Sequence, residues 1–322
     1  MYHALLVPLD GSSFAEQALP LAAELAARSG AVLHIVLVHH SIALVPGPGE
    51  PVVFHPAVDD ATRREEQEYL AAVSAPLGGA GAFRVVTRLL DGPITESIAD
   101  YARNSAIDLV VLTTHGRGVL SRFWIGSVAD RLVRQLEQPM LLVRPHASRG
   151  APSAAMLRRV LIPLDGSPLA ATVLEPATSL GELLGAEFTL FRAVVLAPPV
   201  VLPFPGVIIP PEATATTTTQ QLDATRYLHD VAHQLRLKGL EVATAVEVTR
   251  DPVAAIAEYA EHHAADLIAL ATHGYGGATR FLLGSVADKL LRTATVPLLV
   301  WRPGLQQADD AVTSLPAAHA MF

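Results

Sequence analysis

Residues 114–132 read THGRGVLSRFWIGSVADRL, and residues 272–290 read THGYGGATRFLLGSVADKL. Their glycines and the serine of the GS pair recur at the same spacing, 158 positions apart. Two further pairs of segments repeat: LLVPLDGSSFAEQAL (5–19) with VLIPLDGSPLAATVL (160–174), and QPMLLVRP (138–145) with VPLLVWRP (296–303). The offset grows from 155 to 158 along the chain. Two copies of one domain are therefore predicted.

The length of the chain agrees with this division. A chain of 322 residues corresponds to about two domains of roughly 150 residues. We place the domains at 1–146 and 156–304. The segment 147–155 is small and polar with Pro and Gly, and is predicted to be a linker. The end of the chain, 305–322, lacks periodicity and is predicted to be a flexible tail.

The composition favours a globular protein and argues against several classes of partner. Hydrophobic residues make up 51% and charged residues 17%, which suits a large core. The net charge of −8 provides no basic surface for nucleic acid. The sequence has no cysteine, no secretory signal at its start and no apolar run of about 18 residues. We expect a cytoplasmic protein that binds neither nucleic acid nor membrane.

Short apolar runs alternate with longer segments of helical period, a pattern typical of an α/β fold around a parallel sheet. Strands are predicted in the first copy near 4–9, 32–39, 84–90, 108–113 and 140–144. They are predicted in the second copy near 159–164, 187–195, 242–248, 266–271 and 298–302. Pro20 should distort or delay the first turn of the helix that follows the first strand.

Each copy carries one long insert after its second strand, at 41–60 and at 197–220. The proline content of both inserts argues against regular ladders, whereas their Val, Ile and Phe residues argue against simple disorder. The simpler interpretation is a loop that lies on its own domain. The alternative is a lid or a partner surface.

The loop after the fourth strand lies at the carboxyl edge of the sheet, where open α/β folds bind ligands. A helix is predicted to begin at Ser127, whose hydroxyl would cap it. Ser127 and Asp130 fit a capping box, and Ser285 and Asp288 fit the same pattern in the second copy. A glycine before a helix start also lets a phosphate approach the free N–H groups. Capping is the simpler reading of one GS pair, but the duplicated glycines favour a nucleotide.

Asp10 and Asp165 follow the first strand of each copy, in a D-G-S sequence at the same edge. Each is either a turn former or a carboxylate that faces an adenosine. His115 and His273 have neither a nucleophile motif nor metal-ligand spacing around them. The pairs His39/His40 and His262/His263 point apart, so no metal site is predicted. Arg117, Arg122 and Arg280 are loop arginines that could reach phosphate oxygens.

With these residues in view, each copy resembles a universal stress protein domain, and about nine tenths of the chain resembles the tandem members of that family. The ATP-binding branch of the family has the motif G-x2-G-x9-G-S/T. Thr113 and Ala271 replace the first glycine of that motif here. The resemblance implies a nucleotide site in the first copy formed by Pro8, Asp10, Val38, Thr113, His115, Gly116, Gly126, Ser127 and Val128. In the second copy it implies Pro163, Asp165, Ala193, Ala271, His273, Gly274, Gly284, Ser285 and Val286.

The resemblance also implies the fold and the assembly. Each copy is expected to be a flavodoxin-like (adenine nucleotide alpha hydrolase-like) three-layer sandwich with five parallel strands in the order 3-2-1-4-5. Its fifth strand would be an apolar edge, so the two edges should pair as an intramolecular pseudo-dimer, and further homodimerisation remains open.

The leading functional interpretation is a stress-response regulator whose cofactor is ATP, with Mg²⁺ entering only as an ion carried by the nucleotide. Occupancy of the site would set the loop conformation and the choice of an unknown protein partner. The alternatives are a nucleotide-free interaction module that acts through its long loops, and a slow ATPase. There is no Walker A motif, so at most slow hydrolysis is expected.

The two predicted sites should differ in affinity. Ala271 is smaller than Thr113 and favours tighter binding in the second copy, whereas Arg192 near the adenine position would oppose it.

Overall fold

The computed structural model describes residues 2–41, 43–44, 53–54, 56–77, 81–114, 126–144, 153–196, 200–201, 208–209, 215–272 and 284–303. The chain forms two compact units, Met1–Ala154 and Ala155–Phe322, which correspond to the two copies. Each unit is described by itself, as unit 1 and unit 2.

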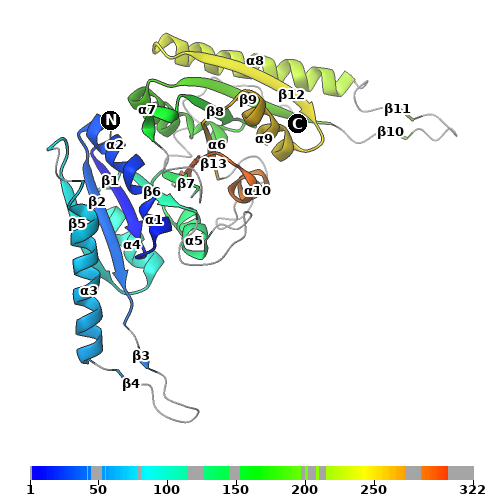
Figure 1. The fold of residues 1–322 in the computed structure, drawn as a ribbon. Coiled ribbons are helices and arrows are strands. Elements are labelled where there is room, and N and C mark those ends of the chain that lie inside the picture. Colours follow the sequence, from blue (N-terminus) through cyan, green and yellow to red (C-terminus); the bar gives the residue numbers. More distant parts are fainter. Residues whose placement is uncertain are drawn as a thin grey trace. The chain divides into compact units, whose positions relative to one another are not determined.

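Each unit is built on a five-stranded parallel sheet (Figure 1). The strands of unit 1 are β1 (Ala4–Leu9), β2 (Val32–His39), β5 (Val85–Asp91), β6 (Leu109–Thr113) and β7 (Met140–Val143). Those of unit 2 are β8 (Arg159–Pro163), β9 (Glu187–Val195), β12 (Val242–Thr249), β13 (Leu267–Ala271) and β14 (Leu298–Trp301). Within the units the orders are β5-β2-β1-β6-β7 and β12-β9-β8-β13-β14, which is the predicted order 3-2-1-4-5 in both.

Helices connect these strands and cover the sheets. Unit 1 contains α1 (Ser13–Glu16), α2 (Leu19–Ser29), α3 (Pro56–Ser74), α4 (Ile94–Asn104) and α5 (Ser127–Gln135). Unit 2 contains α6 (Pro168–Ala171), α7 (Leu174–Leu184), α8 (Ala215–Leu237), α9 (Pro252–His262) and α10 (Ser285–Thr293). A short 3₁₀ turn spans Ala154–Met156. With the right-handed crossovers usual for parallel strands, the first helices of each unit cover one face of its sheet and the last helices the other. In agreement with this, α4 packs against α5, and α9 packs against α10.

The central strands are buried on both faces, as their continuous apolar runs predicted. Leu5, Leu6 and Val7 of β1 have no exposed surface, and neither do Val110 and Val111 of β6. Parallel strands covered by helices on both sides need apolar residues at successive positions rather than at alternate ones. The three-layer α/β fold is thereby confirmed.

A division of the helix is observed near Pro20, and it also occurs in unit 2, where Glu175 stands at the equivalent position. The helical segment after β1 divides into α1 and α2, and Pro20 lies in the first turn of α2, where its missing N–H donor is not needed. Unit 2 has the same division between α6 and α7.

The expectation that the inserts contain no regular ladders is wrong for a few residues. In unit 1, β3 (Ala43–Leu44) pairs with β4 (Val53–Phe54) in antiparallel fashion. In unit 2, β10 (Val200–Val201) pairs in the same way with β11 (Ile208–Ile209). The paired residues are mainly β-branched or large and apolar, and proline-free stretches of two residues suffice for such a ladder. Most other residues of the inserts lie outside the described part of the chain.

Candidate functional site

The residues of the predicted site in unit 1 meet at the carboxyl edge of its sheet. Asp10 follows β1, and Thr113 ends the neighbouring strand β6. The N–H group of Gly126 donates a hydrogen bond of 2.6 Å to the carbonyl of Thr114, so the start of α5 returns to the same edge. In unit 2, Gly284 donates to Thr272 at the same distance. The structure therefore brings the first strand, the fourth strand and the fifth helix together, as predicted.

The predicted capping by Ser127 is wrong by one residue. The N-cap of α5 is Gly126, in extended conformation (φ −59°, ψ 148°), and its carbonyl accepts from the N–H of Asp130. Ser127 is thus the first helical residue and its side chain does not cap the helix. The carboxylate of Asp130 instead accepts two hydrogen bonds of 3.1 Å from Arg134, one turn further along the helix.

The start of α10 repeats this arrangement. Gly284 is its N-cap, with φ −58° and ψ 144°, and this residue provides no side-chain cap. Asp288 accepts two hydrogen bonds from Arg292 at 3.1 Å. The N–H donors and the positive dipole end of a helix start favour an anion, so each of these helix starts is a candidate for binding a phosphate group.

Asp10 and Asp165 form the turns that the sequence suggested as one of two possibilities. Oδ1 of Asp10 accepts from the N–H of Ser12 at 2.9 Å and from its hydroxyl at 2.6 Å. Ser12 in turn caps α1 by accepting from the N–H of Ala15. Gly11, which lies between Asp10 and Ser12, has a φ of +77°, a conformation in which a side chain would be strained. One carboxylate oxygen of Asp10 is therefore used to build the turn.

The corresponding turn in unit 2 has nearly the same geometry. Asp165 accepts from the N–H and the hydroxyl of Ser167 at 2.8 and 2.6 Å, and Gly166 has a φ of +84°. The Asp165 residue is exposed, whereas Asp10 is half-buried. Both aspartates combine a structural role with a position at the predicted site.

The remaining predicted residues fall into two groups. Pro8, Val38, Pro163 and Ala193 are half-buried on the first two strands of their units. Thr113 is 7% exposed at the end of β6, and Ala271 is half-buried at the end of β13. Ser127 and Ser285 are exposed, while Val128 and Val286 are half-buried in the first turns of α5 and α10. His115, Gly116, His273 and Gly274, like Arg117, Arg122 and Arg280, lie outside the described residues.

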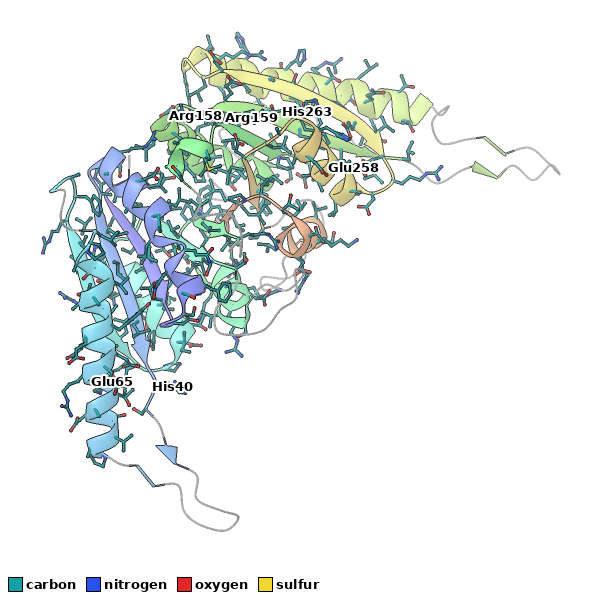
Figure 2. All side chains as sticks on the ribbon, in the orientation of Figure 1. His40, Glu65, Arg158, Arg159, Glu258 and His263 are labelled. Carbon is teal, nitrogen blue, oxygen red and sulfur yellow. The ribbon has the colours of Figure 1, made fainter. Side chains whose placement is uncertain are left out.

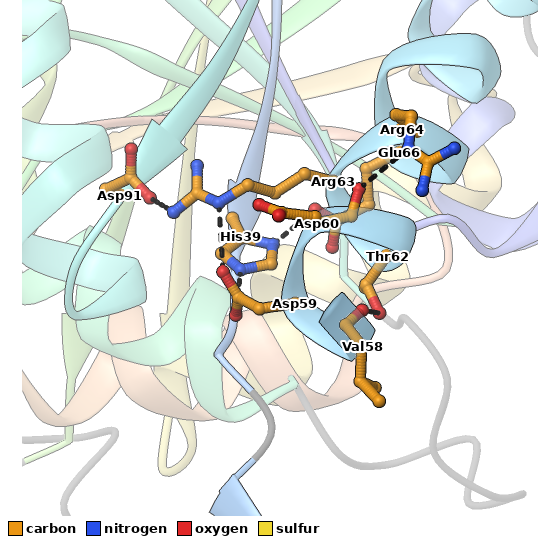
Figure 3. Close-up of polar contacts among 9 residues, drawn as sticks. All are labelled: His39, Val58, Asp59, Asp60, Thr62, Arg63, Arg64, Glu66 and Asp91. Atoms are coloured by element: carbon orange, nitrogen blue, oxygen red, sulfur yellow. Dashed lines mark hydrogen bonds and ion pairs between the residues drawn. The ribbon is translucent and has the colours of Figure 1, made fainter. Parts of the chain in front are cut away.

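Sequence reasoning missed a polar cluster around a buried histidine at the carboxyl edge of unit 1 (Figure 3). His39, at the end of β2, is 2% exposed and makes contacts through both ring nitrogens. Its Nε2 lies 2.9 Å from Asp59 Oδ1, and its Nδ1 lies 2.6 Å from Glu66 Oε2. Arg63 donates to Asp59 at 3.2 Å and also to Asp91 at the end of β5. We call these five residues the His39 cluster.

The cluster holds the two ends of the insert 41–60 together, because His39 precedes the insert and Asp59 lies at its end. Asp59, Arg63 and Glu66 are spaced by four and three residues, which places them on one face of α3. That spacing is the feature of the sequence from which the cluster could have been predicted. The neighbour of His39 behaves differently, since His40 is exposed, as expected for adjacent residues of a strand.

Electrostatics within the cluster favour a charged imidazole. Burial alone would lower the pKa of His39, but the hydrogen bonds to Asp59 and Glu66 raise the pKa above its ordinary value. The hydrogen bond from His39 lowers the pKa of Asp59, and the hydrogen bond from Arg63 lowers that of Asp91. Both ring nitrogens of a charged imidazole donate, which matches a carboxylate on each side. Among the described residues, no group of three His, Cys, Asp or Glu side chains is arranged to hold a metal ion.

A separate hollow of about 310 Å³ lies at the opposite, amino-terminal edge of unit 2. Its lining includes Arg159, Glu187, Glu241, Tyr259 and His263, of which Figure 2 labels Arg159 and His263. None of the residues predicted to bind the nucleotide lines it. The ring of Tyr259 stacks on that of His263, with centroids 3.8 Å apart.

Unit 1 differs from unit 2 at the place of this hollow. Thr189, which lines the hollow, is replaced in unit 1 by His34, 155 positions earlier. Nδ1 of His34 lies 2.8 Å from the hydroxyl of Tyr101, the counterpart of Tyr259. Unit 1 thus has a larger side chain at this position, and that side chain contacts the tyrosine. Of the described helices, none has the length and apolar character needed to cross a bilayer.

Comparison with known proteins finds one family throughout the chain. The family model described as the universal stress protein family matches residues 1–144 and 156–302. A universal stress protein of Mycobacterium tuberculosis (strain H37Rv) is 25% identical over 301 residues, which cover 93% of this chain and 97% of that protein. One from Mycolicibacterium smegmatis is 26% identical over 309 residues, covering 94% and 97%.

A solved structure supports the fold over nearly the whole length. The crystal structure of a universal stress protein from Archaeoglobus fulgidus superimposes with a TM-score of 0.68 and 19% sequence identity, covering 94% of this chain and 98% of that one. At this level of identity the likeness concerns the fold alone.

Proposed function

The chain belongs to the universal stress protein family, and we propose that it binds ATP at the carboxyl edges of its units and acts as a cytoplasmic stress-response regulator. The observation that carries the proposal is the start of α5 and of α10. In both units a helix start with a glycine N-cap lies beside the end of the fourth strand and the aspartate turn. The repeat of this geometry in two independent copies favours a shared ligand.

The chemistry of the helix start suits the phosphates of a nucleotide. Gly126 and Gly284 have no Cβ, so a phosphate can approach their backbone, and the helix dipole attracts its negative charge. The base and ribose would lie nearer to the first two strands, beside Pro8, Asp10 and Val38 in unit 1. Mg²⁺ would enter only with the phosphates.

A regulator follows more naturally from these residues than an enzyme does. The site combines backbone donors with turn-forming aspartates, and one oxygen of each aspartate already accepts two hydrogen bonds from serine. These aspartates are poorly suited to act as a general base, so any ATP hydrolysis would be slow. Nucleotide occupancy would instead set the conformation of the neighbouring loops and the choice of partner protein.

Thr113 and Ala271 favour a second candidate, a nucleotide-free interaction module that acts through its inserts. The resemblance placed a glycine at both positions, and Thr113 fills its place with a β-branched side chain. The two candidates differ in one measurable property, which is whether the folded protein binds ATP at all.

The assembly we propose is an intramolecular pseudo-dimer through the fifth strands, open to further homodimerisation. Taken separately, each unit has this strand at the end of its sheet order. The sequences LLV in β7 and LLVW in β14 are apolar, and an apolar edge strand favours pairing.

The experiment begins with freshly purified protein, which is denatured so that any released nucleotide can be identified by chromatography. ATP and adenosine are then titrated calorimetrically into the wild type, Gly126→Val, Gly284→Val and the double variant. The N-cap angles suit any L-residue, so valine should block the phosphate without straining the backbone. Loss of ATP binding in the double variant, with adenosine binding less affected, is expected.

Gly126→Ala and Gly284→Ala are the matched controls, because alanine adds only one methyl group. Thermal unfolding of every variant checks the fold. ATP binding that persists unchanged in a folded double valine variant would contradict the phosphate assignment. A wild type that neither carries nor binds nucleotide would favour the interaction module.

A further inference from the structure

Arg192 brings a positive charge to the carboxyl edge of unit 2. It lies on β9, one residue before Ala193. Its guanidinium group rests against Gly166, because a Cβ built on that glycine would lie 2.6 Å from Nη1 and 2.9 Å from Cζ. The Cζ atom also lies 5.4 Å from the ring centre of Tyr227 on α8. The side chain thus reaches from the strand to the aspartate turn and contacts an aromatic face.

Unit 1 has an apolar residue at the equivalent strand position. Pro8 pairs with Val36 in unit 1, and Pro163 pairs with Phe191 in unit 2. The residues that follow in the second strands, Leu37 and Arg192, are therefore equivalent. Leu37 is 7% exposed.

The side chains around Leu37 and Arg192 also differ between the two units. Tyr69 is the counterpart of Tyr227, and its hydroxyl donates to Glu16 at 3.0 Å. The counterpart of Glu16 in unit 2 is Ala171, 155 positions later, which cannot accept this bond. Unit 1 therefore has a polar contact to the tyrosine hydroxyl, whereas unit 2 has a guanidinium on the tyrosine ring.

We infer that Arg192 makes unit 2 the weaker of the two adenine-nucleotide sites. This rests on the proposed function. An adenine beside Asp165 and Ala193 needs space next to the turn that the guanidinium contacts. Arg192 must move away and lose its contact with Tyr227, and a guanidinium has only donors to offer, as does the amino group of adenine. The resulting order of affinities is opposite to that predicted from the sizes of Thr113 and Ala271.

The position of Arg192 argues against a role in phosphate binding. The sheet order β9-β8-β13 places β9 on one side of β8 and the end of β13, with the start of α10, on the other. The proposed phosphates lie on the β13 side. The guanidinium lies on the β9 side, where the base is expected.

The test uses variants in which only one site is intact. Gly284→Val retains the site of unit 1, and Gly126→Val retains that of unit 2. Calorimetric titration with ATP should give a dissociation constant about tenfold higher for Gly126→Val, the factor expected for loss of one cation–π contact. Adding Arg192→Leu to Gly126→Val should recover most of this difference, while Arg192→Lys should recover less. Adding Leu37→Arg to Gly284→Val should weaken the site of unit 1 about tenfold.

The outcomes separate this inference from the proposed function. ATP binding by Gly284→Val supports the function whatever the result for Arg192. Equal affinities of the two single-site variants, or weaker binding after Arg192→Leu, would overturn the inference alone. Tight binding of GTP but not ATP by Gly126→Val would also overturn it, because Arg192 would then bind the base. No binding by any folded variant would overturn both. Leu37 is buried, so if the Leu37→Arg protein does not fold, the two Arg192 variants decide.

Discussion

Replacing Gly181 by alanine should destabilise unit 2, although alanine is the better helix former. Gly181 lies inside α7, and a Cβ built on it would lie 2.2 Å from Cζ and 2.5 Å from Cε1 of Phe188. Phe188 is 1% exposed, so its ring has little room to move. Unit 1 has Ala26 and Leu33 at the equivalent positions, both fully buried. At this contact unit 1 thus pairs alanine with leucine, whereas unit 2 pairs glycine with phenylalanine.

The expected magnitude follows from two opposing effects. Helix propensity favours alanine over glycine by about 1 kcal/mol. Overpacking of a core typically costs about 1–3 kcal/mol, and a contact of 2.2 Å with a buried ring belongs in the upper part of that range. A net loss of about 1–2 kcal/mol is expected. For a unit of this size it lowers the melting temperature by about 2–8 °C.

A double-mutant cycle is the assay. Gly181→Ala, Phe188→Leu and the double variant are compared with the wild type by calorimetry, following the transition of unit 2. Phe188→Leu alone leaves a void and should be destabilising. The double variant recreates the alanine–leucine pair of unit 1, so its loss should be at least about 1 kcal/mol smaller than the summed losses of the single variants.

Ala26→Gly in unit 1 is the matched control, because it removes a methyl group where no ring opposes it. It should lower stability through helix propensity and a small void. A Gly181→Ala protein that is more stable than the wild type, with no coupling to position 188, would refute the overpacking.

Two further predictions concern the His39 cluster and the separated units. Because the folded state raises the pKa of His39, the contribution of His39 to stability should be complete below about pH 6.5 and decline as the pH rises through the higher folded-state pKa. The folded state lowers the pKa values of Asp59 and Asp91, so the contributions of these carboxylates should be lost as the pH falls below about 4. The free energy of unfolding, measured with urea from pH 3 to 9, should therefore decline above neutrality in the wild type but not in His39→Gln. Parallel pH profiles of the two proteins would count against a stabilising role of the cluster. The fragments 1–150 and 153–322 should each self-associate through the exposed fifth strand; sedimentation that shows only monomers at tens of micromolar, a range set by typical interface affinities, would remove the main support for the pseudo-dimer.

The fold could be predicted from the sequence because burial on both faces leaves a strong signal. Runs such as ALLVPL and VLHIVLVH are apolar at successive positions, and the observed strands begin and end within about a residue or two of the predicted ranges. The repeat supplied a second, independent reading of each strand. The two-residue ladders of the inserts gave no comparable signal, because so short a pairing needs no periodicity.

The site could be predicted only where it depends on topology. The carboxyl edges of neighbouring parallel strands must meet, so Asp10, Thr113 and Gly126 were expected near one another. The choice between Gly126 and Ser127 as N-cap was not fixed, because both residue types cap helices well and differ by one position. Nor could the contact between Arg192 and Gly166 be derived, since a long side chain can point in several directions from the same strand position.

The differences between the units are not distributed at random around the proposed site. The starts of α5 and α10 agree in their caps, in their backbone angles and in the hydrogen bonds of their first aspartate. The second strands instead differ at Leu37 and Arg192, and again at His39, whose counterpart 155 positions later is Val194. If phosphates bind at the helix starts, both units offer them the same donors and the same dipole. Differences in affinity are then expected from Thr113 and Ala271 at the ends of the fourth strands. They are also expected on the side of the base, where one unit carries the His39 cluster and the other a guanidinium group.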